Sequence, residues 1–281
     1  MVLYMIHRNI FVFDIETIPD TSVVEKLTDS KSKDEKELRK ELEEYSSEVS
    51  GGNSFPRQPF HKVVAISFLE AEIETLRDGT EFYRITDVRT GGTEQSTEEE
   101  IIKGCFNYLS KNPSRLVSYN GRTFDLPVLK YRAMKYGVAA PWLFKSGDKW
   151  NNYQQRYSLD WHCDLLEAFS DFGASARCKM DEVCSILGVP GKLDTDGSQV
   201  AELFDNGKIK EIRDYCETDV INTYLLYLNF QVLSGNLNKD NFIKCNRDLI
   251  DYLASFSDDK NKTHFAEFLA EWRKCDTRKL F

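Results

Sequence analysis

Two acidic residues interrupt an apolar stretch near the start of the chain, at residues 11–20 (FVFDIETIPD). The residues before them are typical of a buried β-strand. Side chains alternate between the two faces of a strand, so Asp14 and Glu16 point to the same side. An ionised carboxylate is costly to bury without a partner. The sequence therefore predicts a core strand that ends beside a group able to neutralise these two acids.

The rest of the chain predicts an α/β fold in which three strands precede an alternation of helices and strands. Asp164 is expected to cap a helix that begins at Leu165. Ribonuclease-H-like domains share this order, and we expect a mixed five-stranded sheet flanked by helices. Further strands are expected near residues 62–70, 81–88, 115–121 and 157–162, and helices near 97–113, 127–137, 180–188 and 208–230, with two more in the tail.

Domain limits follow from charge patterning. Residues 21–58 look like an insertion, because the segment from Asp29 to Val49 is mostly charged and has only a thin apolar stripe. This insertion is interpreted as a solvated helix or a mobile flap. We expect residues 1–232 to form one ribonuclease-H-like domain that contains the insertion, and residues 233–281 to form a C-terminal helical extension.

Composition is that of an ordinary soluble protein, with 41% hydrophobic and 30% charged residues. The longest apolar run, Val63–Leu69, suits a buried strand and is too short to span a membrane. Seven cysteines without a Cys-x-x-Cys pair, and a start without a basic leader, favour a reduced, cytoplasmic protein. The net charge of −9 disfavours non-specific nucleic-acid binding but is compatible with a local basic groove.

Acidic residues occur in three separate apolar contexts. Asp14 and Glu16 end the first strand, Asp125 lies where a strand gives way to a helix, and Asp219 shares a helix face with Tyr215. Each has a purely structural explanation: a solvated strand end, a helix cap, or a Tyr–Asp hydrogen bond. Brought together, however, the carboxylates would repel one another by several kcal/mol unless cations joined them. Oxygen ligands select Mg²⁺ or Mn²⁺, and two such ions can assist phosphoryl displacement.

Three motifs also resemble a known family. The segments DIET (14–17), YNGRTFDLP (119–127) and YCETD (215–219) resemble the three motifs of DEDD 3′–5′ exonucleases, and Tyr-x-x-x-Asp marks the tyrosine branch. Residues 10–230 are similar to the predicted exonucleases related to the proofreading domain of family-B DNA polymerases, as are the segments GVPGK and DGSQV before the third motif. This resemblance implies two-metal-ion hydrolysis at a 3′ end with release of nucleoside 5′-monophosphates.

The resemblance also implies a role for each site residue. Asp14 would bridge two Mg²⁺ or Mn²⁺ ions, and Glu16 and Asp219 would complete the site of the ion that holds the attacking water. Asp125 would support the second ion through water. Tyr215 would orient the attacking water, because a phenol with a pKa near 10 is a poor base at neutral pH.

Four residues are candidate substrate contacts: Thr17, Asn120, Phe124 and Lys192. Asn120 and Phe124 lie in the same loop as Asp125, where an amide would hold the sugar or phosphate and a ring would stack on the terminal base. The alternative for Phe124 is a core aromatic. Lys192 is either a phosphate contact or an ordinary surface lysine.

We interpret the chain as a metal-dependent 3′–5′ exonuclease that acts on single-stranded ends, with DNA favoured over RNA. Two alternatives stay open: a catalytically silent nucleic-acid-binding module, and a phosphohydrolase of short oligonucleotides or nucleotides. No polymerase motifs follow the nuclease core. A proofreading role would therefore require a free-standing enzyme or a protein partner in trans, and no membrane is expected to take part.

Overall fold

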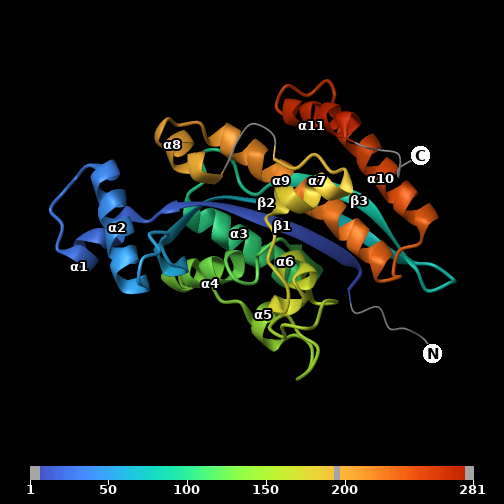
Figure 1. The fold of residues 1–281 in the computed structure, drawn as a ribbon, viewed down its shortest axis with the longest axis horizontal. Helices are drawn as coiled ribbons and strands as arrows, with labels where there is room; N and C mark the ends of the chain where they lie inside the picture. The colour runs from blue at the N-terminus through green and yellow to red at the C-terminus, as the bar shows by residue number, and fades with distance from the viewer. Residues whose placement is uncertain (1–6, 193–196, 276–281) are drawn as a thin grey trace.

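The computed structural model describes residues 7–192 and 197–275 and shows a five-stranded mixed sheet (Figure 1). Its strands are β1 (Asn9–Pro19), β2 (His61–Thr75), β3 (Glu81–Thr90), β4 (Arg115–Ser118) and β5 (His162–Asp164), in the order β3-β2-β1-β4-β5. The first three strands pair antiparallel, whereas β1–β4 and β4–β5 pair parallel. The predicted mixed α/β fold is thus confirmed. Asp196, the first residue of the DGSQV segment, lies outside the described residues.

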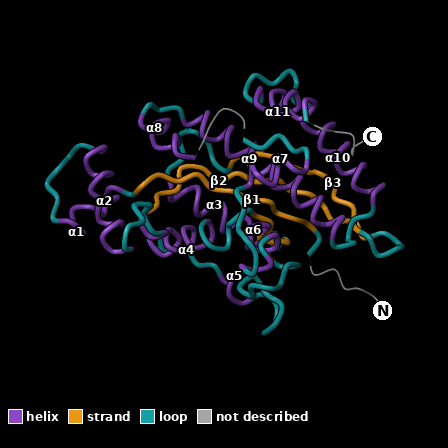
Figure 2. Tube along the Cα trace, in the orientation of Figure 1, coloured by secondary structure: helices purple, strands orange, loops and turns teal. Residues whose placement is uncertain are grey.

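Helices cover both faces of the sheet (Figures 1 and 2). One face packs on α3, α4 and α5, and the other packs on α7, α9, α10 and α11. The helices are α1 (Val24–Thr28), α2 (Glu35–Ser50), α3 (Glu98–Lys111), α4 (Asp125–Lys135), α5 (Pro141–Lys145), α6 (Leu165–Phe169), α7 (Met180–Leu187), α8 (Val200–Asp205), α9 (Ile209–Leu233), α10 (Lys239–Ala254) and α11 (Thr263–Lys274). Single 3-10 turns cover Thr21–Val23, Gln58–Phe60, Asp171–Gly173 and Gly197–Gln199.

Alternation along β1 explains how the sheet presents its acids. Phe11 and Phe13 belong to the core formed with α3 and α4, whereas Ile10 and Val12 belong to the core formed with α9. Asp14 continues the second series, so its side chain points toward α9. This helix is itself buried on nearly all sides, which brings its polar residues against the sheet.

The first strand does not end at its acids, as the sequence had indicated. β1 continues to Pro19, which pairs with His61 of β2, with an irregularity after Glu16. Its parallel pairing with β4 stops at Val12. The acids therefore lie beyond the end of β4 rather than at the end of β1, because β2 is long enough to keep β1 extended.

Two other limits differ from the predictions. The fifth strand covers only His162–Asp164 instead of 157–162, because only these residues pair with β4. Helix α4 begins at Asp125 rather than at Pro127, since the amide of Leu126 already bonds to the carbonyl of Gly121 at 2.8 Å. The predicted cap is confirmed, because Asp164 accepts the amides of the first turn of α6.

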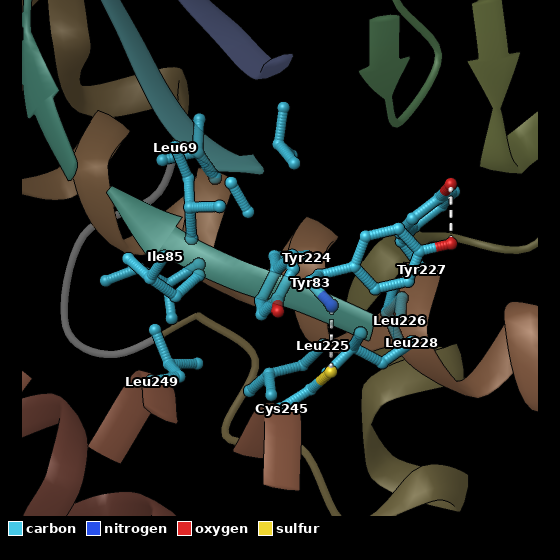
Figure 3. Packing of buried hydrophobic residues seen from close by; sticks show 14 of the residues in the cluster. Leu69, Tyr83, Ile85, Tyr224, Leu225, Leu226, Tyr227, Leu228, Cys245 and Leu249 are labelled. Atoms are coloured by element: carbon cyan, nitrogen blue, oxygen red, sulfur yellow. Dashed lines mark hydrogen bonds between the residues drawn. The ribbon is translucent and has the colours of Figure 1, made fainter. Parts of the chain in front are cut away.

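The outer edge of β3 is covered by α10. Three side chains of this helix accept backbone N–H groups of the strand, which would otherwise be open to pairing with another chain. Figure 3 shows one of these bonds within the apolar core that the two elements share. The bonds join Tyr83 to Cys245 Sγ (3.3 Å), Ile85 to Asp248 Oδ2 (2.7 Å) and Val88 to the Tyr252 hydroxyl (2.9 Å).

The charged insertion is helical. α1 and α2 project at one end of the sheet (Figure 1), and of the apolar stripe only Leu42 is fully buried while Val49 is exposed. Arg39 of α2 forms an ion pair of 2.6 Å with Asp205 at the end of α8. The insertion is therefore a largely solvated helix attached to the fold at a few points. Among the described helices, none combines the length and apolarity needed to cross a membrane.

Candidate active site

Two segments, β1 and α9, bring their acids to one place. Asp14 is half-buried and Glu16 is buried, and one ligand atom from each lies within 4.8 Å of the other and of the Cys216 sulfur. Cys216 belongs to α9, next to Tyr215 and three residues before Asp219. The strand thus presents its acids directly to the helix face that carries the third motif.

Asp125 reaches the same place from the opposite side of the sheet. It is the first residue of α4 and is buried, and its Oδ1 accepts the backbone N–H of Ile15 at 3.2 Å. That amide lies between Asp14 and Glu16 in β1. The charges of Asp125 and Asp219 both raise the pKa of Glu16, and that of Asp125 also raises the pKa of Asp14, so acids of the first, second and third motifs lie close together.

Burial and mutual repulsion make this group of acids hard to ionise. The pKa of each of Asp14, Glu16 and Asp219 is raised well above its usual value, first by burial and then by the charges of the other acids. Burial also raises the pKa of Asp125 to about 7. Such pKa shifts cluster at functional sites, because bringing like charges together in a protein core costs folding free energy.

Tyr215 and Asp219 interact one turn apart on α9. The phenol forms a hydrogen bond with Asp219, and burial together with the nearby acids raises the pKa of Tyr215. The phenol therefore stays protonated and acts as a donor. Oδ1 of Asp219 is buried and has no hydrogen-bond partner among the described residues. A buried carboxylate oxygen without a donor is costly unless a cation binds it.

These residues fit a divalent cation. The four carboxylates offer hard oxygen ligands of the kind that Mg²⁺ and Mn²⁺ select, and a cation would remove their repulsion and satisfy the unpaired oxygen of Asp219. Cys216 is not a suitable ligand. Its thiol contacts the Asp14 carbonyl (3.5 Å) and carboxylate (3.8 Å), and burial raises its pKa well above the usual value, so it remains a protonated donor.

The loop before Asp125 is organised by Asp164. This carboxylate accepts the backbone N–H groups of Asn120 (3.0 Å) and Arg122 (2.8 Å) in addition to capping α6. Asn120 has a positive φ of 70°, which Asn tolerates better than most residues. The sequence indicated only the helix cap, because the bonds to the loop join residues about forty positions apart.

A cleft of about 610 Å³ opens beside the acids. Asn120 and Lys192, two of the candidate substrate contacts, line it together with Asp14 and Asp219. The Lys192 ammonium lies 5.9 Å from the centre of the Tyr215 ring, and its charge lowers the pKa of Asp219 against the larger effect of burial. Lys192 therefore faces the acids rather than open solvent.

The segment GVPGK that carries this lysine is attached to α9. Asn222 uses its side-chain amide to bond both the N–H (3.1 Å) and the carbonyl (2.7 Å) of Gly191. Asn222 follows Asp219 by three residues, on the same side of the helix. This positioning residue was missed from sequence, since an Asn inside a helix carries no local signal of such a contact.

The other two substrate candidates lie in an aromatic group around His61. The Thr17 hydroxyl bonds to Nδ1 of His61 at 2.9 Å, and Nε2 of His61 bonds to the Pro56 carbonyl. Phe124 is half-buried and forms an edge contact with the His61 ring, with 4.9 Å between the ring centres. The centre of the Phe55 ring lies 5.8 Å from the centre of the Phe124 ring. Phe124 is thus neither a full core residue nor a fully exposed ring.

The mixed five-stranded sheet with helices on both faces is a ribonuclease-H-like fold. A family model described as predicted 3′–5′ exonucleases related to the exonuclease domain of PolB matches residues 53–272, and the chain belongs to that family. The matched region contains Asp125, Tyr215 and Asp219 and begins after β1, so it does not include Asp14 or Glu16. A search of curated proteins found no match to the chain.

Proposed function

We propose that this protein is a two-metal-ion 3′–5′ exonuclease that hydrolyses phosphodiester bonds at the 3′ end of single-stranded nucleic acid, with DNA favoured over RNA. The observation that carries the proposal is the group of four acids from β1, α4 and α9, with an unpaired buried oxygen on Asp219. Membership of an exonuclease family supports it. The products are nucleoside 5′-monophosphates.

In this proposal the acids hold the cations and α9 positions the water. Asp14, Glu16, Asp125 and Asp219 would hold Mg²⁺ or Mn²⁺, which supplies Lewis-acid activation of water and stabilises the charge on the leaving oxygen. The protonated phenol of Tyr215 orients the attacking water as a hydrogen-bond partner and does not remove its proton. Lys192 offers its charge to a phosphate oxygen at the mouth of the cleft.

The candidate substrate contacts surround this centre. Asn120 lines the cleft beside Asp14, where its amide would hold the terminal sugar or phosphate. Phe124 would stack on the terminal base, a contact that tolerates any base. Thr17 would act through His61, because its hydroxyl is bonded to that ring and the ring supports Phe124.

The remaining expectations form part of the same proposal. Residues 1–232, including the insertion 21–58, would form the nuclease domain, and residues 233–281 a C-terminal helical extension. The seven cysteines are free thiols, which agrees with a cytoplasmic location. A role in DNA repair or proofreading would place the protein beside a polymerase as a partner in trans.

A labelled-strand assay tests the proposal. Single-stranded DNA and RNA, labelled at the 5′ end, are incubated with the protein in EDTA, Mg²⁺ or Mn²⁺. We expect stepwise shortening from the 3′ end with either metal, loss of activity in EDTA and in Asp219→Asn, and normal activity in Glu99→Gln, a surface control on α3. Absence of cleavage by the wild-type protein with both metals would reject the nuclease proposal and leave the two alternatives, a silent binding module and a phosphohydrolase of short oligonucleotides or nucleotides.

A further inference from the structure

A second hollow, of about 500 Å³, lies next to the acidic cleft, and four of its ten lining residues are cationic. Arg122, Lys130, Arg156 and Arg177 line it, and Glu167 is its one lining carboxylate. We call it the basic pocket. Arg177 also lines the acidic cleft, so the two hollows are neighbours that share a side chain.

Two of these arginines are held by the single acid. Glu167 is almost fully buried, with 2% of its side chain exposed, and accepts hydrogen bonds from both Arg156 and Arg177. The two arginines remain more than 40% exposed. A guanidinium has five N–H donors, so each arginine keeps donors for another anion. Glu167 thus fixes two cations in place while neutralising only one charge.

The other two cations have no carboxylate within ion-pair distance among the residues the structure describes. The guanidinium of Arg122 bonds to the carbonyls of Tyr153 (3.3 Å) and His162 (3.1 Å), and its Nε is buried and unpaired. Burial, and then the charge of Arg122, lowers the pKa of Lys130. Like charges placed together in this way are costly, and an anion in the pocket would relieve that cost.

The position of the basic pocket identifies the anion. Arg122 belongs to the loop that carries Asn120 and leads into Asp125, so one loop separates the pocket from the acids. A strand whose last phosphodiester lies at the acids would carry its preceding phosphates past Arg177. The chain as a whole has a net charge of −9 and would repel such a strand. A local excess of positive charge is then needed to attract it.

We propose that the basic pocket binds backbone phosphates of the single strand upstream of the scissile bond. The inference rests on the proposed function and narrows it, because it makes the substrate a strand of several nucleotides rather than a mono- or dinucleotide. Arginine is suited to this role through its paired N–H donors, and contacts to phosphates are independent of sequence.

Binding measured without turnover tests the proposal. A 5′-fluorescein-labelled dT12 and a labelled dT2 are titrated with protein in EDTA, and anisotropy is followed at several salt concentrations. Lys130→Gln and Arg177→Gln should each weaken dT12 binding severalfold and reduce the slope of log K against log[salt] by about 0.7, the value for one phosphate contact on a single strand. Binding of dT2 should not change.

The control is Arg84→Gln, which removes an exposed arginine paired with Glu74 at the far edge of the sheet. Lys130→Gln leaves the Glu167 ion pairs intact, so a loss of binding in this variant reports the lost charge and not a change in folding. Thermal unfolding of both variants verifies that they are folded. If both bind dT12 with the affinity and salt slope of Arg84→Gln, the proposal is wrong and the cluster is structural.

The outcome is independent of cleavage. If dT12 binding depends on Lys130 and Arg177 while the wild-type protein cleaves no strand in Mg²⁺ or Mn²⁺, the nuclease proposal fails and the phosphate site stands. If strands are cleaved with an unchanged KM in both variants, the phosphate site fails and the nuclease proposal stands.

Discussion

Tyr215 and Cys216 are neighbours in sequence and serve different acids of the site. The phenol bonds to Asp219, and the thiol contacts Asp14. Both donors come from α9, so a single helix supplies hydrogen bonds to two carboxylates that repel each other. The structure thereby lowers part of the electrostatic cost of the site with neutral groups.

Tyr215→Phe is expected to slow cleavage without abolishing it. The substitution removes one hydrogen bond to a charged group, worth about 1.5–3 kcal/mol, which corresponds to roughly a 10- to 150-fold loss of kcat. KM should change little, because the acids and the cleft remain. Single-turnover kinetics in Mg²⁺ measure the effect, and full activity in this variant would contradict the assigned role.

Asp219→Asn is expected to stabilise the metal-free protein while it removes activity. The change eliminates one of several buried like charges, and its amide can donate to a neighbouring carboxylate. We expect a gain of about 1 kcal/mol, or roughly 3 °C in Tm, measured by calorimetry in EDTA. Glu99→Gln, which removes an exposed acid from an ion pair with Lys103, should not raise Tm; a lower Tm for Asp219→Asn would contradict the prediction.

At the scale of single residues, local periodicity accounts for part of the site. The two-residue period of a strand places Asp14 with Glu16, and the four-residue spacing of a helix places Tyr215 with Asp219. The contact between Cys216 and Asp14 joins residues that are 202 positions apart. No sequence pattern predicts such a contact, because it depends on how α9 lies on the sheet.

Among the elements, the pairing of α10 with β3 is the least expected feature. The helix was predicted from its apolar face, yet its polar residues Asp248 and Tyr252 accept hydrogen bonds from backbone N–H groups of the strand. The limits of elements were predicted less well than their order. β5 is only three residues long and is defined by its pairing with β4, so the strand predicted at residues 157–162 lies too early in the sequence.

Asp248→Ala should destabilise the protein more than a surface substitution on the same helix. It leaves the N–H of Ile85 without its acceptor at a partly buried position, which costs about 1–3 kcal/mol. Asp248→Asn keeps an acceptor and should cost less. Urea unfolding measures the differences against Asp251→Ala, an exposed control on α10. Equal stability of Asp248→Ala and Asp251→Ala would show that α10 does not secure the strand edge.

For the whole molecule, the acids make stability depend on pH. Folding raises the pKa of Asp125 from 3.8 to about 7, and those of the other three site acids are raised as well. A group with a raised pKa binds more protons when folded, so the free energy of unfolding falls as the pH rises through the folded pKa. Three buried histidines, His7, His61 and His162, have lowered pKa values and make the protein more stable as the pH rises. Their effect is confined to pH values below about 6.5, where these histidines are protonated in the unfolded chain.

The metal-free protein should therefore lose stability as the pH rises from about 6.5 through 7, where Asp125 loses its proton and the histidines no longer oppose the change. Each excess proton bound by the folded state contributes up to about 1.4 kcal/mol per pH unit. Denaturant unfolding in EDTA at several pH values measures the slope. The slope should be smaller in Asp125→Asn, and Mg²⁺ should also reduce it by holding the acids in their ionised form. A wild-type protein that gains stability over this range would contradict the prediction.

The attachment of α10 also bears on how this protein meets other molecules. With the outward amides of Tyr83, Ile85 and Val88 already engaged, that margin of the sheet is unavailable for β-augmentation by a neighbouring copy or an extended peptide. The opposite margin is β5, whose three residues provide little length for such pairing. Recognition of another protein would then proceed through side-chain surfaces, so a binding partner need not contribute a strand.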